Sequence, residues 1–396
     1  MTNVSIVFSS SDYYVPYLSV CISSLLDFIS AENEYKITIL ENEISDENKK
    51  LLSDMVKETN CSLVFFPIQK YLEDKQFFTH DHVSKETFFK LFIPEIFKTE
   101  KILFCDADII FQDDPAKLFK LNLKNKYIGA GLCHHWNGLM HLKKDFFLYT
   151  KKLGIRNENK YFQGGILLFN NNMFCKNDVQ DIVELALKSN YINHDQDVLN
   201  MWFQNKAFIF DSKWNYETSQ EGFRKYSIPF MDDTHKKQWI KAGKSPAIIH
   251  YSGKEKPWFY PNEDFADVWW KYAHSTVYYE EILKRLVIFS TAHEAQNIID
   301  TRNILIANQN KMVNQLRLEF ETIHFPNINK RFSLNEYNLK LLFVMEHRLY
   351  FFIKKIIYAV KIMLSYGARK QIYKSKYLKC KQLLIDMSNL QKRLNR

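Results

Sequence analysis

Short apolar runs alternate with longer amphipathic runs along the first part of the chain. Residues 4–8, 36–40 and 63–66 are rich in β-branched and aromatic side chains and predict strands. Residues 16–26 have helical spacing with proline in the first turn, and Ser45 can cap a second helix whose first turn carries two acids. This alternation of strand and helix favours a doubly wound α/β fold.

Three further apolar runs predict strands, at residues 101–105, 165–169 and 247–249. Residues 87–97 and 197–205 have helical spacing. In open α/β sheets, ligands bind beyond the carboxyl ends of the strands. The polar residues that follow these runs are therefore the strongest candidates for chemistry.

The character of the chain changes near Ser275, where Gly and Pro become rare and long helical patterns rich in Lys and Arg begin. Residues 331–396 hold 15 Lys and Arg against three acids, a charge of +12, so the rest of the +9 chain carries −3. We therefore expect an α/β domain over residues 1–275 and a helical, basic domain over residues 276–396.

The basic tail also indicates a partner. Residues 349–364 place apolar side chains on one side of a helix and lysines largely on the other, which predicts a helix lying in the plane of an anionic membrane. The alternative is a helical domain whose apolar stripe is ordinary core. Nucleic acid is excluded as a partner, because the first part of the chain is net acidic and holds no RNA-binding motif.

The six cysteines are widely scattered without a C-x-x-C pair, and the first residues run straight into a strand pattern without a secretory leader. We expect free thiols and a cytoplasmic protein. The tail would place it peripherally on the inner face of the plasma membrane.

An acid pair, Asp106 and Asp108, follows the strand at residues 101–105, with Ala107 between them. Two carboxylates one residue apart at a strand end can reach one hard cation. By itself this pattern is weak, because such pairs also occur in solvated turns.

A second motif runs from His250 to Trp258 after the last predicted strand. Imidazole suits Mn²⁺ better than Mg²⁺, Gly253 allows a close backbone approach, and Lys256 supplies a point charge for a phosphate. A lone histidine after a strand is usually structural, but this spacing and the distant acid pair together indicate a metal and diphosphate site.

Two shorter motifs complete the set. Asp195, Gln196 and Asp197 stand at a helix start, where the alternative is an ordinary acidic first turn. Gly164 and Gly165 precede a buried strand, which indicates that a ligand or another backbone passes close by.

Together these four motifs, in this order, closely resemble glycosyltransferase family eight, which includes bacterial lipopolysaccharide galactosyl- and glucosyltransferases, glycogenin and galactinol synthase. The resemblance covers residues 4–258, with residues 9–14 and 88–91 also matching the family pattern. It implies a GT-A-like mixed sheet and a retaining transfer of galactose or glucose from a UDP-sugar to a glycan hydroxyl. The implied cofactor is Mn²⁺, with Mg²⁺ as the alternative.

The resemblance also implies a role for each matching residue. Asp106, Asp108 and His250 would bind the metal, and Gln196 would lie near the anomeric carbon. Asp195 would share its catalytic and sugar-binding role. The nucleotide would be held by Ser9, Ser10, Ser11, Tyr14, Asp106, Ala107, Asp108, Gly253 and Lys256, and the donor sugar by Lys90, Gln163, Gly164, Gly165, Asp195 and Gln196.

Some positions depart from the family pattern. Ser11 stands where an acid often reads uracil, Lys90 where arginine is usual, and Gln163 and Gly164 where F-N-A or F-N-S is common. The departure at Ser11 bears on the choice of nucleotide, and those at Lys90, Gln163 and Gly164 leave the choice between galactose and glucose open. The expected acceptor is a lipo-oligosaccharide or a glycosylated surface protein, and the alternative function is a catalytically inactive UDP-sugar- or glycan-binding protein.

Overall fold

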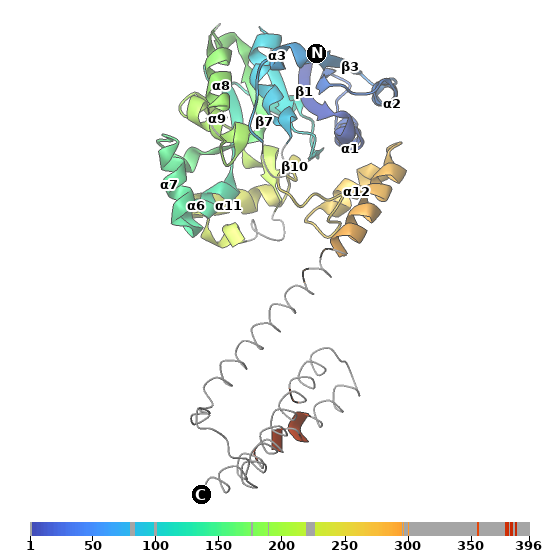
Figure 1. The fold of residues 1–396 in the computed structure, drawn as a ribbon. Coiled ribbons are helices and arrows are strands. Elements are labelled where there is room, and N and C mark those ends of the chain that lie inside the picture. The colour runs from blue at the N-terminus through green and yellow to red at the C-terminus, as the bar shows by residue number, and fades with distance from the viewer. Residues whose placement is uncertain are drawn as a thin grey trace, which may run out of the picture. The chain divides into compact units, whose positions relative to one another are not determined.

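The computed structural model describes residues 2–79, 84–98, 101–175, 177–188, 190–218, 226–294, 296, 300, 355, 377–379, 381–382 and 385 (Figure 1). The chain divides into two compact units, Met1–Ala292 and His293–Arg396. The helix expected at residues 349–364 lies outside the described residues, apart from Lys355. It stays a prediction, as does the domain that was to contain it.

The first unit extends past the boundary expected near Ser275. Ile282 is fully buried in its core, and the Tyr278 hydroxyl donates to Asn48 Oδ1 at 2.8 Å. The helical pattern that begins after Ser275 therefore starts within the α/β unit.

A sheet of seven strands forms the centre of this unit, and its mixed character confirms what the family resemblance implied. Its strand order is β3-β2-β1-β4-β7-β6-β8. Strand β7 runs antiparallel to both of its neighbours, and the other pairs are parallel. The strands are β1 (Asn3–Ser11), β2 (Glu34–Asn42), β3 (Cys61–Pro67), β4 (Lys101–Cys105), β6 (Ile128–Leu132), β7 (Phe162–Asn170) and β8 (Ala207–Ile209).

A second, three-stranded sheet lies beside the first and was not predicted. Strand β10 (Ile248–His250) is its centre, antiparallel to β5 (Ile109–Phe111) and parallel to β9 (Tyr216–Glu217). The first residue of β5 follows Asp108 directly, and it pairs with His250. This pairing carries the distant histidine to the acid pair.

Helices cover both faces of the central sheet. In Figure 1, α8 and α9 lie beside β7, while α6, α7 and α11 lie together at another edge of the unit. Ser45 caps α2 as predicted, since its hydroxyl accepts from the Asn48 amide at 3.3 Å. The helices are α1 (Val15–Leu26), α2 (Asp46–Val56), α3 (Gln69–Leu72), α4 (Ile93–Ile96), α5 (Ala116–Phe119), α6 (His134–Leu142), α7 (Lys144–Lys152), α8 (Asp178–Leu187), α9 (His194–Phe203), α11 (Asp233–Gly243) and α12 (Ala266–His274).

The prediction of one continuous helix at residues 87–97 was wrong. The chain forms a 3-10 helix, η2 (Lys85–Phe92), followed by the short α4. Pro94 lies at the start of α4 and has no amide hydrogen to continue the hydrogen bonds of a preceding turn. A new helix therefore starts there.

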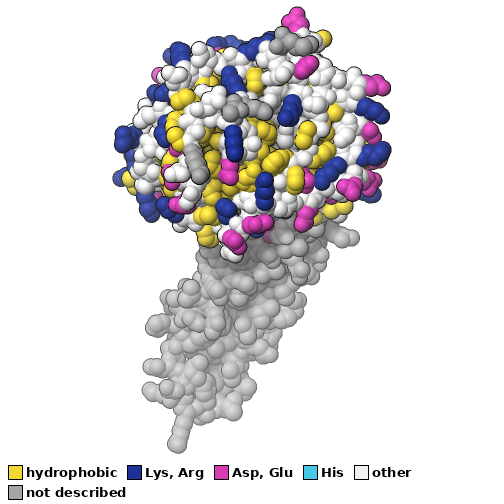
Figure 2. All heavy atoms as spheres, turned by 90° about the horizontal axis from the view of Figure 1, so that it is seen from above, with side chains coloured by type: hydrophobic (Ala, Val, Ile, Leu, Met, Phe, Trp, Pro, Cys, Tyr) yellow, Lys and Arg dark blue, Asp and Glu magenta, His cyan; other side chains and the backbone are white. Residues whose placement is uncertain are grey.

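Two hydrophobic cores lie on opposite faces of the central sheet. In β1, Ile6 and Phe8 belong to one core and Val7 to the other, as expected for side chains that alternate along a strand. On the face of the molecule shown in Figure 2, basic and acidic side chains are interspersed and hydrophobic ones gather toward the middle. Within the described residues, no helix is long and apolar enough to cross a membrane.

Candidate active site

A pocket of about 770 Å³ brings together nearly all the residues that the sequence singled out. His250 and Asp197 are not among the residues that line it, although His250 Nε2 lies 3.3 Å from Asp108 Oδ1. The candidates that line the pocket are Ser9, Ser10, Ser11, Tyr14, Lys90, Asp106, Ala107, Asp108, Gln163, Gly164, Gly165, Asp195, Gln196, Gly253 and Lys256.

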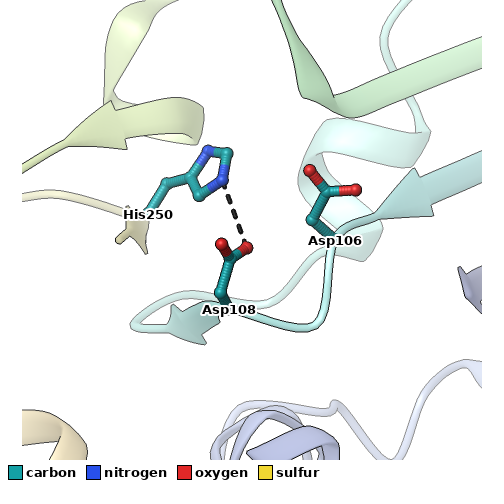
Figure 3. Close-up of side chains that lie close together, drawn as sticks. All are labelled: Asp106, Asp108 and His250. Carbon is teal, nitrogen blue, oxygen red and sulfur yellow. Dashed lines mark ion pairs between the residues drawn. The ribbon is translucent and has the colours of Figure 1, made fainter. Parts of the chain in front are cut away.

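Asp106, Asp108 and His250 lie close together, at the ends of strands that belong to the two sheets (Figure 3). Asp106 follows β4 and Asp108 precedes β5, while His250 ends β10. One ligand atom from each of the three side chains lies within 4.8 Å of the others. Among the described residues, they form the one such group of three or more His, Cys, Asp or Glu side chains.

Two buried atoms of this group lack a hydrogen-bond partner. His250 Nε2 lies 3.3 Å from Asp108 Oδ1, but neither atom makes a hydrogen bond. The other ring nitrogen, Nδ1, is 2.8 Å from Asn215 Oδ1, which holds the ring in place. A buried oxygen and nitrogen left in this way, next to a second carboxylate, fit a divalent cation such as Mn²⁺.

Lys256 reinforces the charge of Asp108. Its Nζ forms an ion pair with Asp108 Oδ2 and donates to the Tyr251 carbonyl at 2.6 Å. Burial alone would raise the pKa of Asp108, but the Lys256 ammonium and His250 more than offset it and hold that pKa well below its usual range. The carboxylate therefore stays ionised near neutral pH.

Lys90 is a fully buried lysine between two carboxylates. Its Nζ lies 3.2 Å from Asp106 Oδ1 and 3.0 Å from Asp195 Oδ2, and it donates to the Gly164 carbonyl at 2.9 Å. Burial works to lower the pKa of Lys90, but Asp106 and Asp195 raise it above the ordinary value. The charged lysine thus joins the acid pair to the first turn of α9.

The paired glycines lie where the predicted close approach occurs. A Cβ on Gly165 would collide with Asp106 Oδ2 and with the His250 ring. A Cβ on Gly164 would lie 3.2 Å from Asp195 Oδ2. The Gly164 amide donates to Gln196 Oε1 at 3.0 Å, which fixes the glutamine side chain. Both glycines leave room for neighbouring site residues.

Asp197 turns away from the pocket and anchors its wall. Its buried carboxylate accepts from the hydroxyls of Tyr149 at 2.7 Å and Tyr161 at 2.5 Å, and from the Asn193 amide at 2.9 Å. Burial raises the pKa of Asp197 despite these bonds. The hydrogen bonds hold the loop that leads into Asp195 and Gln196.

Aromatic side chains lie together at one part of the pocket wall. Tyr14 packs edge-on against Trp258, with ring centroids 5.7 Å apart. Tyr13 also lines the pocket and is 60% exposed, and the Arg285 guanidinium lies 4.3 Å from its ring centroid. Sequence reasoning assigned no role to Tyr13, although it lies within the matching residues 9–14, and it missed Arg285, because no motif connects residues so far apart in the chain.

Another wall is formed mainly by α6 and its neighbours. Cys133, His135, Trp136, Leu139 and Phe146 line the pocket there. His134, by contrast, points to other partners, with its ring nitrogens 3.1 Å from His235 Nδ1 and 2.8 Å from Ser212 Oγ.

Solved structures share this architecture. The bifunctional glycosyltransferase WbbM, in apo form, matches with a TM-score of 0.64 at 27% identity, over 72% of this chain and 52% of that protein. The galactosyltransferase LgtC, in complex with donor and acceptor sugar analogues, matches with a TM-score of 0.56 at 22% identity, over 70% of this chain and 96% of that protein. The fold is therefore GT-A-like, as expected. The chain spans about half of WbbM.

Sequence comparison gives the family. A putative glycosyltransferase of Haemophilus influenzae is 28% identical over 262 residues, covering 64% of this chain and 73% of that protein. The profile described as Glycosyl transferase family 8 matches residues 5–261, which include every candidate residue of the pocket. The chain therefore belongs to glycosyltransferase family 8.

Proposed function

We propose that this glycosyltransferase is a retaining hexosyltransferase, which moves galactose or glucose from a UDP-sugar to a glycan hydroxyl and depends on Mn²⁺. One observation carries the proposal: Asp106, Asp108 and His250 converge at a pocket with two buried ligand atoms left without hydrogen bonds. Mg²⁺ is the alternative ion. A divalent ion held there would supply positive charge to the departing diphosphate.

The side chains around this cluster would each hold a different part of the donor. Lys256 adds a charge for the diphosphate, and Gly253 lets the backbone come close to it. Ser9, Ser10 and Ser11 would hold the uridine, with Tyr14 against the base. Lys90, Gln163, Gly164, Gly165 and Asp195 would contact the hexose, and Ala107 would pass beside the nucleotide.

Gln196 is the proposed group on the face of the sugar opposite the leaving diphosphate. Its carboxamide lines the pocket and accepts from Gly164 at 3.0 Å, so the oxygen has a defined position. There it would stabilise positive charge that develops at the anomeric carbon. The acceptor hydroxyl would then attack from the face that the diphosphate leaves, which retains the α configuration of the donor.

For the acceptor and the cellular location, we propose classes and not single identities. A lipo-oligosaccharide or a glycosylated surface protein would suit an enzyme in the cytoplasm beside the inner face of the plasma membrane. The basic tail would bring it to anionic lipid. Sedimentation with anionic and neutral liposomes tests this part, and a protein that ignores anionic liposomes at low salt would contradict it.

Release of UDP tests the function. Purified protein is incubated with Mn²⁺, an array of glycan acceptors, and UDP-galactose, UDP-glucose or UDP-N-acetylglucosamine in turn. We expect acceptor-dependent UDP release with one of the two hexose donors. An inactive UDP-sugar-binding protein, the alternative, would bind these donors in calorimetry without releasing UDP from any of them.

A further inference from the structure

Three buried polar side chains form a chain of hydrogen bonds from the pocket wall to His250. Gln163 lies on β7 and lines the pocket, Asn215 ends the 3-10 helix η5 (Ser212–Asn215), and His250 ends β10. Asn215 Nδ2 donates to Gln163 Oε1 at 3.1 Å, and Asn215 Oδ1 lies 2.8 Å from His250 Nδ1. Segments far apart in the sequence are thus joined in the protein interior.

A backbone amide determines the direction of this chain. The Gly165 amide donates to Gln163 Oε1 at 2.5 Å, and a backbone N–H can only donate. The atom of Gln163 at this position is therefore its carbonyl oxygen, and Asn215 has to meet that oxygen with its own amide nitrogen. Asn215 then presents its oxygen to His250, so Nδ1 of the ring is the donor.

The same chain determines what His250 presents to the acid pair. A neutral imidazole with its proton on Nδ1 has an unprotonated Nε2, which is the form that binds a metal ion. This nitrogen lies 3.3 Å from Asp108 Oδ1, in the group of ligand atoms that Asp106 completes. The hydrogen bonds that begin at the Gly165 amide therefore end by turning a metal-binding lone pair toward two carboxylates.

Two glycines leave room for this arrangement. Gly165 is two residues from Gln163 on β7, so the two positions share a face of the strand. A Cβ on Gly165 would collide with the His250 ring, and its carbonyl accepts from the Asp106 amide at 2.7 Å. On β6, a Cβ on Gly131 would lie 2.9 Å from the Cβ of Asn215. The packing of β6 and β7 thus fixes where the chain runs.

We infer that Gln163 and Asn215 are positioning residues that hold His250 Nε2 toward a cation at the acid pair. This inference rests on the proposed function for the presence of the metal. Residues that support a metal-binding imidazole fix its orientation and its free nitrogen, and changing them costs about 10–100-fold in metal affinity. Because Gln163 Oε1 already accepts twice, the contact proposed between Gln163 and the hexose would come from its NH₂ group.

The nitrogen bound to Mn²⁺ can be observed without turnover. Electron spin echo envelope modulation of the full-length protein, loaded with Mn²⁺, detects an imidazole nitrogen through its coupling to the electron spin of the metal. We expect this coupling in the parent protein, and its loss in His250→Ala assigns it. Asn215→Ala should lose the coupling and Gln163→Met should weaken it, while Mn²⁺ stays bound to the acid pair.

Metal affinity is the second measurement. By calorimetric titration, we expect the Mn²⁺ dissociation constant to rise at least about tenfold in Asn215→Ala, and by a smaller factor in Gln163→Met, which leaves the contact between Asn215 and the ring in place. Gln163→Met also carries the test if Asn215→Ala does not fold. Circular dichroism checks folding in every variant.

Asn171→Ala is the matched control. Asn171 is also a buried asparagine, and its Nδ2 donates to the Phe97 carbonyl at 2.9 Å, but neither residue lines the pocket. Asn171→Ala removes a buried amide hydrogen bond, as Asn215→Ala does, so both should lower the free energy of unfolding. We expect Asn171→Ala to keep the nitrogen coupling and the Mn²⁺ affinity of the parent.

The results that would overturn the inference are specific. They are the absence of nitrogen coupling in the parent, unchanged coupling and Mn²⁺ affinity in both Asn215→Ala and Gln163→Met, or equal losses in Asn171→Ala. Coupling lost in Asn215→Ala but unchanged in Gln163→Met would remove Gln163 from this role. Coupling that depends on Asn215, without UDP release from any donor, would overturn the proposed function and leave this inference standing.

Discussion

His250 Nε2 and Asp108 Oδ1 face each other at 3.3 Å, both buried and neither hydrogen-bonded. The two atoms lie within ion-pair distance of each other, and a divalent cation held between them and Asp106 would bind ligand atoms that the folded chain brings together. The pair therefore links the stability of this region to the metal that the proposed chemistry requires.

Gly165→Ala should weaken metal binding while the protein still folds. A Cβ at this position collides with Asp106 Oδ2 and with the His250 ring, so two ligands must move apart. We expect the Mn²⁺ dissociation constant to rise at least about tenfold, the scale seen when supporting residues of metal sites are changed. Calorimetric titration with Mn²⁺ measures it.

Gly164→Ala is the matched comparison for that experiment. A Cβ there would lie 3.2 Å from Asp195 Oδ2. Its three nearest atoms belong to Asp195 and Gln196, not to the proposed metal ligands. It should change Mn²⁺ affinity far less than Gly165→Ala. Equal affinities in the two variants would show that the collision at Gly165 is relieved elsewhere.

Gln196→Ala should lower kcat more than it lowers the affinity for UDP. The glutamine is proposed to act on the anomeric carbon, whereas the nucleotide is held by other residues, so its loss removes an interaction made in the transition state. We expect kcat to fall about 10²-fold or more. Initial rates and calorimetry with UDP separate the two effects, and weaker UDP binding with unchanged kcat would remove Gln196 from this role.

Lys90→Met should destabilise the fold. The substitution leaves Asp106 and Asp195 without the ammonium that lies 3.2 Å and 3.0 Å from them. Removing one partner of a buried ion pair costs about 3–5 kcal/mol. Chemical denaturation measures the loss, and the exposed pair between Lys50 and Asp54 provides a control, since Lys50→Met should cost less than about 1 kcal/mol.

Lys90→Arg tests donor choice instead of stability. It keeps the charge but presents a planar, five-donor group at the place proposed for the hexose hydroxyls. We expect the ratio of galactose to glucose use to change, and Gln163→Asn to shift it as well. Unchanged ratios in both variants, measured as kcat/KM for the two donors, would place discrimination elsewhere.

The predictable part of the molecule is the part encoded by short runs. The strand expected at residues 101–105 matches β4, because the apolar residues after Lys101 end at a charged pair and leave little choice of boundary. The positions of Asp106 and Asp108 followed from it. The helical spacing at residues 87–97 did not give one continuous helix, because Pro94 interrupts the hydrogen-bond pattern and α4 starts there.

The features of the site that could not be predicted depend on contacts between segments far apart in the sequence. Asn215 and Glu217 come to His250 through the pairing of β9 with β10, between short strands with no periodic signal of their own. Asp197 belonged to a recognised motif, but the two tyrosine hydroxyls that turn it from the pocket lie on other elements. Local patterns thus located most of the candidates, and the residues that orient them came from elsewhere.

His134 should make the fold less stable in acid. Burial, followed by the neighbouring His235, lowers the pKa of His134 from 6.5 to about 3. The unfolded chain therefore takes up a proton between those values that the folded chain does not, so stability rises with pH across this window. From pH 7 to pH 5 the loss is about 2 kcal/mol. Denaturation at both pH values measures it, and His134→Gln should reduce the dependence.

Metal dependence of UDP release tests the account most directly. Initial rates are measured with the donor and acceptor that support transfer, in Mn²⁺, after EDTA, and in Asp106→Ala, Asp108→Ala and His250→Ala, with circular dichroism to check folding. We predict that EDTA abolishes release and added Mn²⁺ restores it, and that each folded variant loses at least about 10²-fold in kcat/KM. Full turnover in EDTA, or in any of the three variants, would contradict the account.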